Sequence, residues 1–162
     1  MNFEEKHSFD RPVETVSKMY FDRAFFERKY REQGAWDVEV LEHHRDDRTF
    51  RIKCRFTMKS DAPIPDFARK FVADSISIVQ QDSWDMQKLT GRIDTELKGM
   101  PVKIFADMTL SPDGQGCVNR LKWNVACNIP LIGGKLEKII AEDLQIKSKK
   151  DQQVSKSILQ DY

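Results

Sequence analysis

The sequence predicts an α+β fold in which a curved, seven-stranded antiparallel sheet is covered by one long C-terminal helix. Two changes of hydrophobic period lead to this prediction. After Gly34 the apolar residues recur at every second position, which is typical of half-buried strands. After Gly134 they recur at helical spacing along one stripe. Two short helices are expected between the first and second strands.

Composition indicates a single globular domain covering residues 1–162, with 40% hydrophobic and 33% charged residues. The net charge of +1 provides no overall attraction to nucleic acid or membrane, so we expect no nucleic-acid partner. No secretory signal or membrane-spanning stretch is visible. The three cysteines, Cys54, Cys117 and Cys127, lack paired spacing and are expected to be buried free thiols in a cytoplasmic protein.

The N-terminal third predicts a strand over residues 3–9, followed by two helices. Pro12 suits the first helical position, where its missing N–H costs nothing. Asp22 is expected to begin the second helix, and Gly34 to end it. Phe25, Phe26 and Tyr30 should face inward from that helix.

The remaining strands are predicted from alternation between apolar and polar residues. A hairpin is expected around the Asp46–Asp47 turn, because apolar residues alternate with charged ones on both sides of it. Prolines, glycines and the SPDGQG turn separate the later strands. The expected segments are 36–40, 50–58, 76–86, 89–97, 101–110 and 117–129.

The glycine pair Gly133–Gly134 lacks the spacing and the hydroxyl residue of a phosphate-binding loop. We interpret it instead as a sharp corner with close backbone approach, where the helix is laid across the sheet. The apolar stripe of this helix is interrupted at Lys147 and Asp151 and returns weakly afterwards. Its last turns are therefore expected to be solvated or frayed.

The order of strand, two short helices, six strands and one long helix resembles the helix-grip fold of the START-like superfamily. That superfamily includes lipid-transfer proteins, polyketide cyclases and birch-pollen allergens. More narrowly, the chain looks like a bacterial family of uncharacterised START-like proteins. The stretches that carry this resemblance are FDRPVETVSKMYFD, PIPDFARKF, GMPVKIFADMTL and IPLIGGKLEKIIAEDL.

The resemblance implies a cavity between sheet and helix that holds an apolar small molecule or lipid, without a cofactor. Alternation along the strands places a set of mostly apolar side chains on the inward face, with two helical residues above them. They could also be plain core. The expected lining is Val38, Phe56, Met58, Ile76, Ile78, Trp84, Ile93, Leu97, Met108, Leu121, Trp123, Leu136 and Ile140.

Polar residues on the inward face are candidates for a role in this cavity. Glu5, His7 and Asp82 share the inward register, and a carboxylate–histidine pair could perform acid–base chemistry. Each could equally be a structural group or lie at an exposed strand end. His43 and His44 are adjacent and point to opposite faces of a strand, so no metal site is expected.

The segment 62–73 is the candidate moving part, because prolines fix its start and Phe67 and Phe71 lie one helical turn apart. It could form a lid, touch a membrane transiently through aromatic and basic residues, or be a packed connection. Three hypotheses for function therefore remain open. They are binding of an apolar ligand, cyclase- or aromatase-like catalysis in the same cavity, and a surface module for membrane or protein contact.

Overall fold

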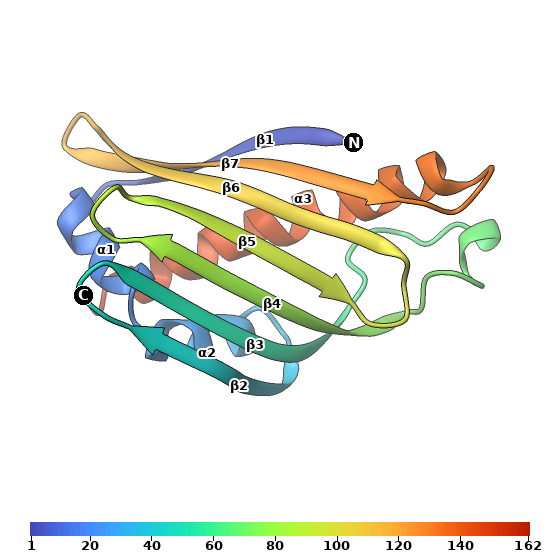
Figure 1. Cartoon of the computed structure of the whole chain (residues 1–162), viewed down its shortest axis with the longest axis horizontal. Helices are drawn as coiled ribbons and strands as arrows, with labels where there is room; N and C mark the ends of the chain where they lie inside the picture. Colours follow the sequence, from blue (N-terminus) through green and yellow to red (C-terminus); the bar gives the residue numbers. More distant parts are fainter.

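The computed structural model describes residues 1–162 and has one antiparallel sheet with a long helix across its concave face (Figure 1). This is the predicted α+β architecture. The strands are β1 (Asn2–Phe9), β2 (Trp36–Arg45), β3 (Thr49–Lys59), β4 (Ser75–Asp85), β5 (Thr90–Leu97), β6 (Val102–Asp113) and β7 (Gly116–Cys127). The helices are α1 (Val13–Tyr20), α2 (Arg23–Glu32), the 3₁₀ turn η1 (Asp66–Ala68) and α3 (Gly133–Leu159).

The strand order is β1-β7-β6-β5-β4-β3-β2, and every neighbouring pair is antiparallel. Strands β2 to β7 follow one another as hairpins, and β1 then pairs with β7 to bring the N-terminal strand beside the last one. Because side chains alternate across the sheet, one face of it points toward the helices, with α2 over β2 and α3 across the rest. This inward face carries the core.

Helix α1 lies at the end of the sheet near the C-terminus of the chain, and α2 lies behind β2 and β3 (Figure 1). Asp22 caps α2 by accepting a hydrogen bond from Ala24 N at 3.0 Å. Gly34 follows α2 with a positive φ of 93°, as its predicted role as a stop requires. Pro12 occupies the cap position of α1 rather than the expected first helical position.

The glycine pair forms the predicted corner between β7 and α3. A Cβ atom on Gly133 would lie 2.4 Å from the carbonyl oxygen of Cys127, so only glycine permits this approach. A Cβ atom on Gly134 would meet no atom within 4 Å. The interpretation of a structural corner is confirmed, and Gly133 alone enforces it.

The end of α3 differs from the expectation of solvated or frayed turns. Ile158 and Leu159 are buried in the main core, and Ser155 is fully buried. The last residues are held by contacts with α2, where Arg28 pairs with Asp161 and Tyr162 donates a hydrogen bond to Asp22 at 2.5 Å. The expectation was wrong because α1 and α2 provide a second surface for the helix beyond the sheet.

Two hydrophobic clusters form the interior. The larger one joins the inward face of the sheet to α1, α2 and α3. The smaller one contains Ala68, Cys127 and Leu136, and it anchors the η1 segment to the start of α3. The three cysteines are buried and unpaired, as predicted. None of the three α-helices is both long and apolar enough to cross a bilayer.

Candidate functional site: a cavity beneath the long helix

A cavity of about 130 Å³ lies between the concave face of the sheet, α2 and α3. Twenty of its 33 lining residues are hydrophobic, so most of its wall is apolar. It forms because α3 and the two short helices cover the curved sheet without filling all the space above it. Cavities of about 150 Å³ with apolar walls are large enough for benzene, which sets the scale of this one.

Most residues expected on the inward face do line the cavity. These are Phe56, Met58, Ile76, Ile78, Trp84, Ile93, Leu97, Met108, Leu121, Trp123 and Ile140. Val38 and Leu136 do not line it. Val38 belongs to β2, where the pairing register shifts between Trp36 and Glu39 and α2 covers the strand. Leu136 packs in the smaller cluster, beyond the end of the cavity.

Trp84 is one of two tryptophans on the cavity floor, and Gly91 makes its position possible. The two residues face each other across β4 and β5, and a Cβ on Gly91 would lie 2.8 Å from the indole ring. The indole therefore lies over the glycine and stacks on Tyr20, with 5.5 Å between ring centroids. A large, flat aromatic surface results on this side of the cavity.

Two of the three predicted polar residues, Glu5 and His7, lie beside Ser148 of α3. His7 Nε2 lies 2.8 Å from the Ser148 hydroxyl, and Glu5 lies beside the same serine. Burial lowers the pKa of His7, and burial raises the pKa of Glu5. His7 and Ser148 line the cavity, whereas Glu5 does not. The expected Glu–His pair is therefore bridged by a serine, with one member outside the cavity.

A buried ion pair joins α2 to α3 in the cavity wall. Lys29 Nζ lies 3.1 Å from Asp151 Oδ2, and Gln33 donates a hydrogen bond to the same oxygen at 2.9 Å. Burial lowers the pKa of Lys29, but the charges of Asp151 and Asp82 outweigh burial and raise it overall. Burial likewise raises the pKa of Asp151, and Lys29 outweighs this effect and lowers it. Both groups are therefore held in their charged forms.

Asp82, the third predicted polar group, lies on the cavity floor and is 5% exposed. Its one side-chain hydrogen bond comes from Gln80 Nε2 at 3.0 Å. Burial raises the pKa of Asp82, opposed by the charge of Lys29 and by Gln80. Asp82 and the His7–Ser148 group share no hydrogen bond, so the three predicted polar residues do not form one hydrogen-bonded group.

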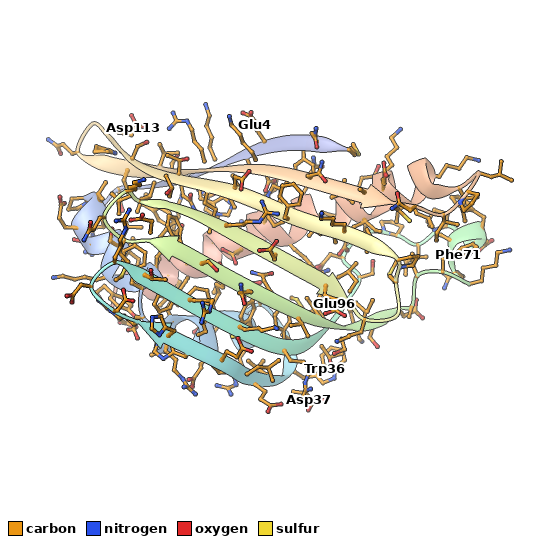
Figure 2. All side chains as sticks on the ribbon, in the orientation of Figure 1. Glu4, Trp36, Asp37, Phe71, Glu96 and Asp113 are labelled. Atoms are coloured by element: carbon orange, nitrogen blue, oxygen red, sulfur yellow. The ribbon has the colours of Figure 1, made fainter.

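The segment 62–73 contributes to the cavity through residues other than the predicted phenylalanines. Phe67 is 46% exposed and Phe71 packs against the smaller cluster, while Val72 and Ala73 line the cavity. Figure 2 shows Phe71 at the end of the molecule opposite α1. The segment is thus a packed connection at Phe71 and part of the cavity wall just after it.

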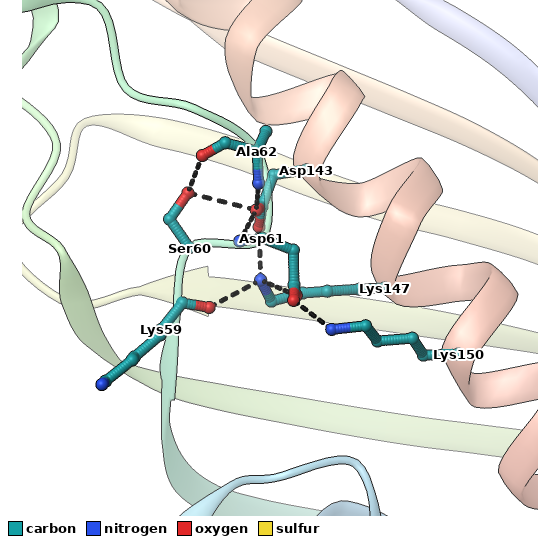
Figure 3. Close-up of polar contacts among 7 residues, drawn as sticks. All are labelled: Lys59, Ser60, Asp61, Ala62, Asp143, Lys147 and Lys150. Atoms are coloured by element: carbon teal, nitrogen blue, oxygen red, sulfur yellow. Dashed lines mark hydrogen bonds and ion pairs between the residues drawn. The ribbon is translucent and has the colours of Figure 1, made fainter.

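A network of polar contacts ties the end of β3 to α3 at the rim of the cavity (Figure 3). Asp143 Oδ1 accepts hydrogen bonds from the backbone N–H groups of Asp61 at 2.5 Å and Ala62 at 2.9 Å. Lys147 Nζ lies 2.8 Å from Asp61 and 2.6 Å from Asp143. We call Asp61, Asp143 and Lys147 the rim network.

The rim network is reinforced by backbone and side-chain contacts around it. Lys147 also donates to the carbonyl of Lys59 at 2.9 Å, and Lys150 pairs with Asp61. Since Asp143, Lys147 and Lys59 line the cavity, the network connects β3 to α3 across its rim. Opening the cavity at this point requires these contacts to separate.

Several polar lining residues escaped the sequence analysis, namely Lys29, Ser148, Asp151 and the rim pair Asp143–Lys147. The available signal was the spacing of 143, 147 and 151, which keeps three polar residues on one helical face. We interpreted this interruption of the apolar stripe as the end of packing. It is instead the part of α3 that faces polar partners on α2, β1 and the segment after β3.

Solved structures share this architecture at low sequence identity. A START superfamily protein from Mycobacterium smegmatis matches with a TM-score of 0.62 and 13% identity, covering 97% of this chain and 98% of that one. The Zhui aromatase/cyclase from a Streptomyces species matches with a TM-score of 0.67 and 8% identity, covering 99% and 93%. The protein therefore has the START-like fold that the sequence resemblance indicated.

The profile of a family described as a protein of unknown function (DUF2505) matches residues 4–158, and the chain belongs to this family. An uncharacterized protein of Mycobacterium tuberculosis, Rv0481c, is 24% identical over 154 residues, covering 88% of this chain and 87% of the relative. The expected relation to uncharacterised bacterial proteins is thereby confirmed. The family description names no ligand or activity.

Proposed function

We propose that the protein binds a hydrophobic small molecule in the cavity beneath α3. The observation that carries the proposal is a partly open space of about 130 Å³ with a mostly apolar wall. Natural cores leave few voids larger than a water molecule, so unfilled apolar space of this size calls for an explanation. The START-like architecture supports the same proposal.

The size of the cavity favours a compact ligand over a lipid with two acyl chains. A space near that which admits one benzene ring suits a ring system or a single short chain. A larger lipid would require the rim network to open and α3 to move away from β3. We therefore place small apolar molecules before lipids among the expected ligands.

Filling the cavity tests this proposal. Ile93→Trp puts a larger side chain on the cavity floor, and Thr109→Trp puts the same side chain on the exposed outer face of β6. Binding of toluene, a neutral one-ring molecule of the size that this cavity admits, should weaken by at least about tenfold in the first variant and stay unchanged in the second. Equal binding by wild type and both variants would contradict the proposed site.

Catalysis in this cavity gains no specific support from the arrangement of the predicted acids and bases. Glu5 lies outside the cavity wall, and Asp82 has no hydrogen bond to His7 or Ser148. A cyclase-like reaction would need an acid and a base placed around one substrate. Binding without chemistry is therefore the function we propose, in a cytoplasmic protein whose three free cysteines suit a reducing compartment.

We also propose a transient membrane contact, through the end of the molecule that carries η1. Phe67 is 46% exposed there with Lys135 above its ring, and Leu131 is fully exposed. Apolar side chains beside cations suit an anionic bilayer surface. Liposome flotation should recover less Phe67→Asp than wild type from vesicles containing phosphatidylserine. Equal recovery of the two proteins would dismiss this contact and leave the ligand cavity unaffected.

A further inference from the structure

The cavity wall contains polar atoms that have no partner in the protein. Six buried side-chain nitrogen and oxygen atoms lack a hydrogen bond, and four of them belong to lining residues. Those four are Tyr30 Oη, Thr95 Oγ1, Asn119 Oδ1 and Trp123 Nε1. All four residues are at least nine-tenths buried. Since buried polar atoms are nearly always hydrogen-bonded, Tyr30 Oη and Thr95 Oγ1 require water or a ligand as partner, whereas Trp123 also lies beside the Glu5 carboxylate.

Two of the unpartnered atoms flank Asp82 on one side of the cavity. Thr95 pairs with Gln80 across β4 and β5, which places it diagonally next to Asp82 on the inward face. Tyr30 approaches the same floor from α2, because its ring stacks on Phe56 of β3 with 4.1 Å between centroids, and Phe56 pairs with Ile78, two residues from Gln80 on β4. We call Tyr30, Gln80, Asp82 and Thr95 the polar patch. The patch is surrounded by apolar side chains of the floor, including Ile78 and Ile93.

The buried cation at the polar patch is already paired, while Lys59 and Lys147 line the cavity at its rim. Lys29 is the buried cation of this region, and Asp151 already pairs with it at 3.1 Å. Asp82 adds a second carboxyl group within range of the same lysine. A ligand carboxylate at the polar patch would therefore lie near Asp82 and Asp151, and the one nearby cation, Lys29, is already paired with Asp151. An unpaired charge in such a buried site is costly.

We infer that the ligand is a neutral amphiphile whose apolar body fills the cavity and whose hydroxyl or carbonyl oxygen hydrogen-bonds to Tyr30 and Thr95. This inference rests on the proposed function and narrows its ligand class. Both hydroxyl groups can donate or accept, so they suit an alcohol, phenol or ketone. A pure hydrocarbon would bury their oxygen atoms without partners, which disfavours it.

Three probes of one ring separate these ligand classes: phenol, toluene and benzoate, each measured by calorimetric titration. In wild type we expect phenol to bind about tenfold more tightly than benzoate. In the Tyr30→Phe/Thr95→Val variant, phenol affinity should fall about tenfold while toluene affinity stays equal or rises. Ser17→Ala removes an unpartnered buried oxygen that lies outside the cavity, so it should change none of these affinities.

The thermal stability of the free protein provides a second readout. Because Tyr30→Phe and Thr95→Val remove only unpartnered oxygen atoms, the melting temperature should stay equal or rise. A clear decrease would show that these hydroxyls are satisfied within the protein, and it would overturn the inference.

The binding outcomes also separate this inference from the proposed function. Toluene binding without any effect of the two substitutions on phenol would leave the apolar cavity as the site and overturn the polar patch as its recognition element. Benzoate binding more tightly than phenol would overturn the neutral ligand class. Failure of all three probes to bind wild type would overturn the proposed function together with the inference.

Discussion

Gly133 and Gly134 are adjacent in the sequence but differ in their surroundings. At Gly133 a Cβ would lie 2.4 Å from the Cys127 carbonyl oxygen, while at Gly134 it would meet open space. The first glycine is therefore required by the approach of α3 to β7. The second is a helical residue whose flexibility in the unfolded chain only lowers stability.

Alanine substitutions should separate these two roles. Gly133→Ala should lower the free energy of unfolding by about 2 kcal/mol or more, because overlap with the backbone forces the corner to shift. Gly134→Ala should raise it by about 0.5 kcal/mol through helix propensity. Urea denaturation of both variants checks the prediction, and similar losses in the two would show that the corner does not depend on Gly133.

Among the elements, α2 and α3 are joined by the buried pair Lys29–Asp151. Lys29 is 5% exposed and lies about 5 Å above three aromatic rings, those of Phe25, Phe26 and Tyr30. The aliphatic stem of the lysine thus packs among rings while its ammonium group reaches the carboxylate. This contact holds the C-terminal half of α3 against α2 and forms one wall of the cavity.

Removing one partner of this pair should cost more than removing both. Lys29→Met should lower the free energy of unfolding by about 3 kcal/mol, because Asp151 is left without its cation in a mostly buried site. Lys29→Met/Asp151→Leu should recover most of this loss. A double-mutant cycle by chemical denaturation measures the coupling. Losses that simply add would mean that the two charges act independently.

A second connection between elements is the rim network, which holds the segment after β3 on α3. Asp143 accepts two backbone hydrogen bonds from this segment, at Asp61 and Ala62. A carboxylate that accepts N–H groups gives stronger hydrogen bonds than a neutral acceptor. We therefore expect the rim network to determine how readily the segment after β3 separates from α3, and to contribute less to the free energy of global unfolding.

Asp143→Ala should accelerate hydrogen exchange of the Asp61 and Ala62 amides by at least about tenfold. Exchange in the central strands, such as at Ala106, should change little. Glu142→Ala, one residue earlier and exposed on α3, serves as the matched control. Unchanged exchange at Asp61 and Ala62 in Asp143→Ala would show that other contacts close the rim.

At the scale of the whole molecule, the cavity results from the mismatch between a wide curved sheet and its helical cover. Seven strands form one concave face, while α3 crosses it diagonally, α1 lies at one end and α2 lies behind β2 and β3 (Figure 1). The space that remains is lined by the middle of the strands and by the polar middle of α3. A ligand there would contact nearly every element, so binding should stabilise the whole fold.

The number, order and inward face of the strands could be predicted because alternation reports directly which side chains face the core. The corner at Gly133 was equally predictable. An apolar strand followed by Pro130 and a glycine pair is typical of a sharp turn, and the spacing excludes a phosphate-binding loop. Val38 and Leu136 were wrongly assigned to the cavity because periodicity predicts which face of a strand or helix is buried, but not which element packs on that face. A register shift in β2 and the anchoring of η1 decide what lies next to these two residues.

The sequence by itself determined the fold class, the free cysteines and most of the apolar side chains that line the cavity, since local periodicity and turn residues specify them. Only the tertiary structure decided how the polar residues meet. Lys29 and Asp151, or His7 and Ser148, are more than a hundred residues apart and come together through the crossing of α3. A one-dimensional pattern contains no information on such long-range distances, and these distances define the chemistry of the cavity.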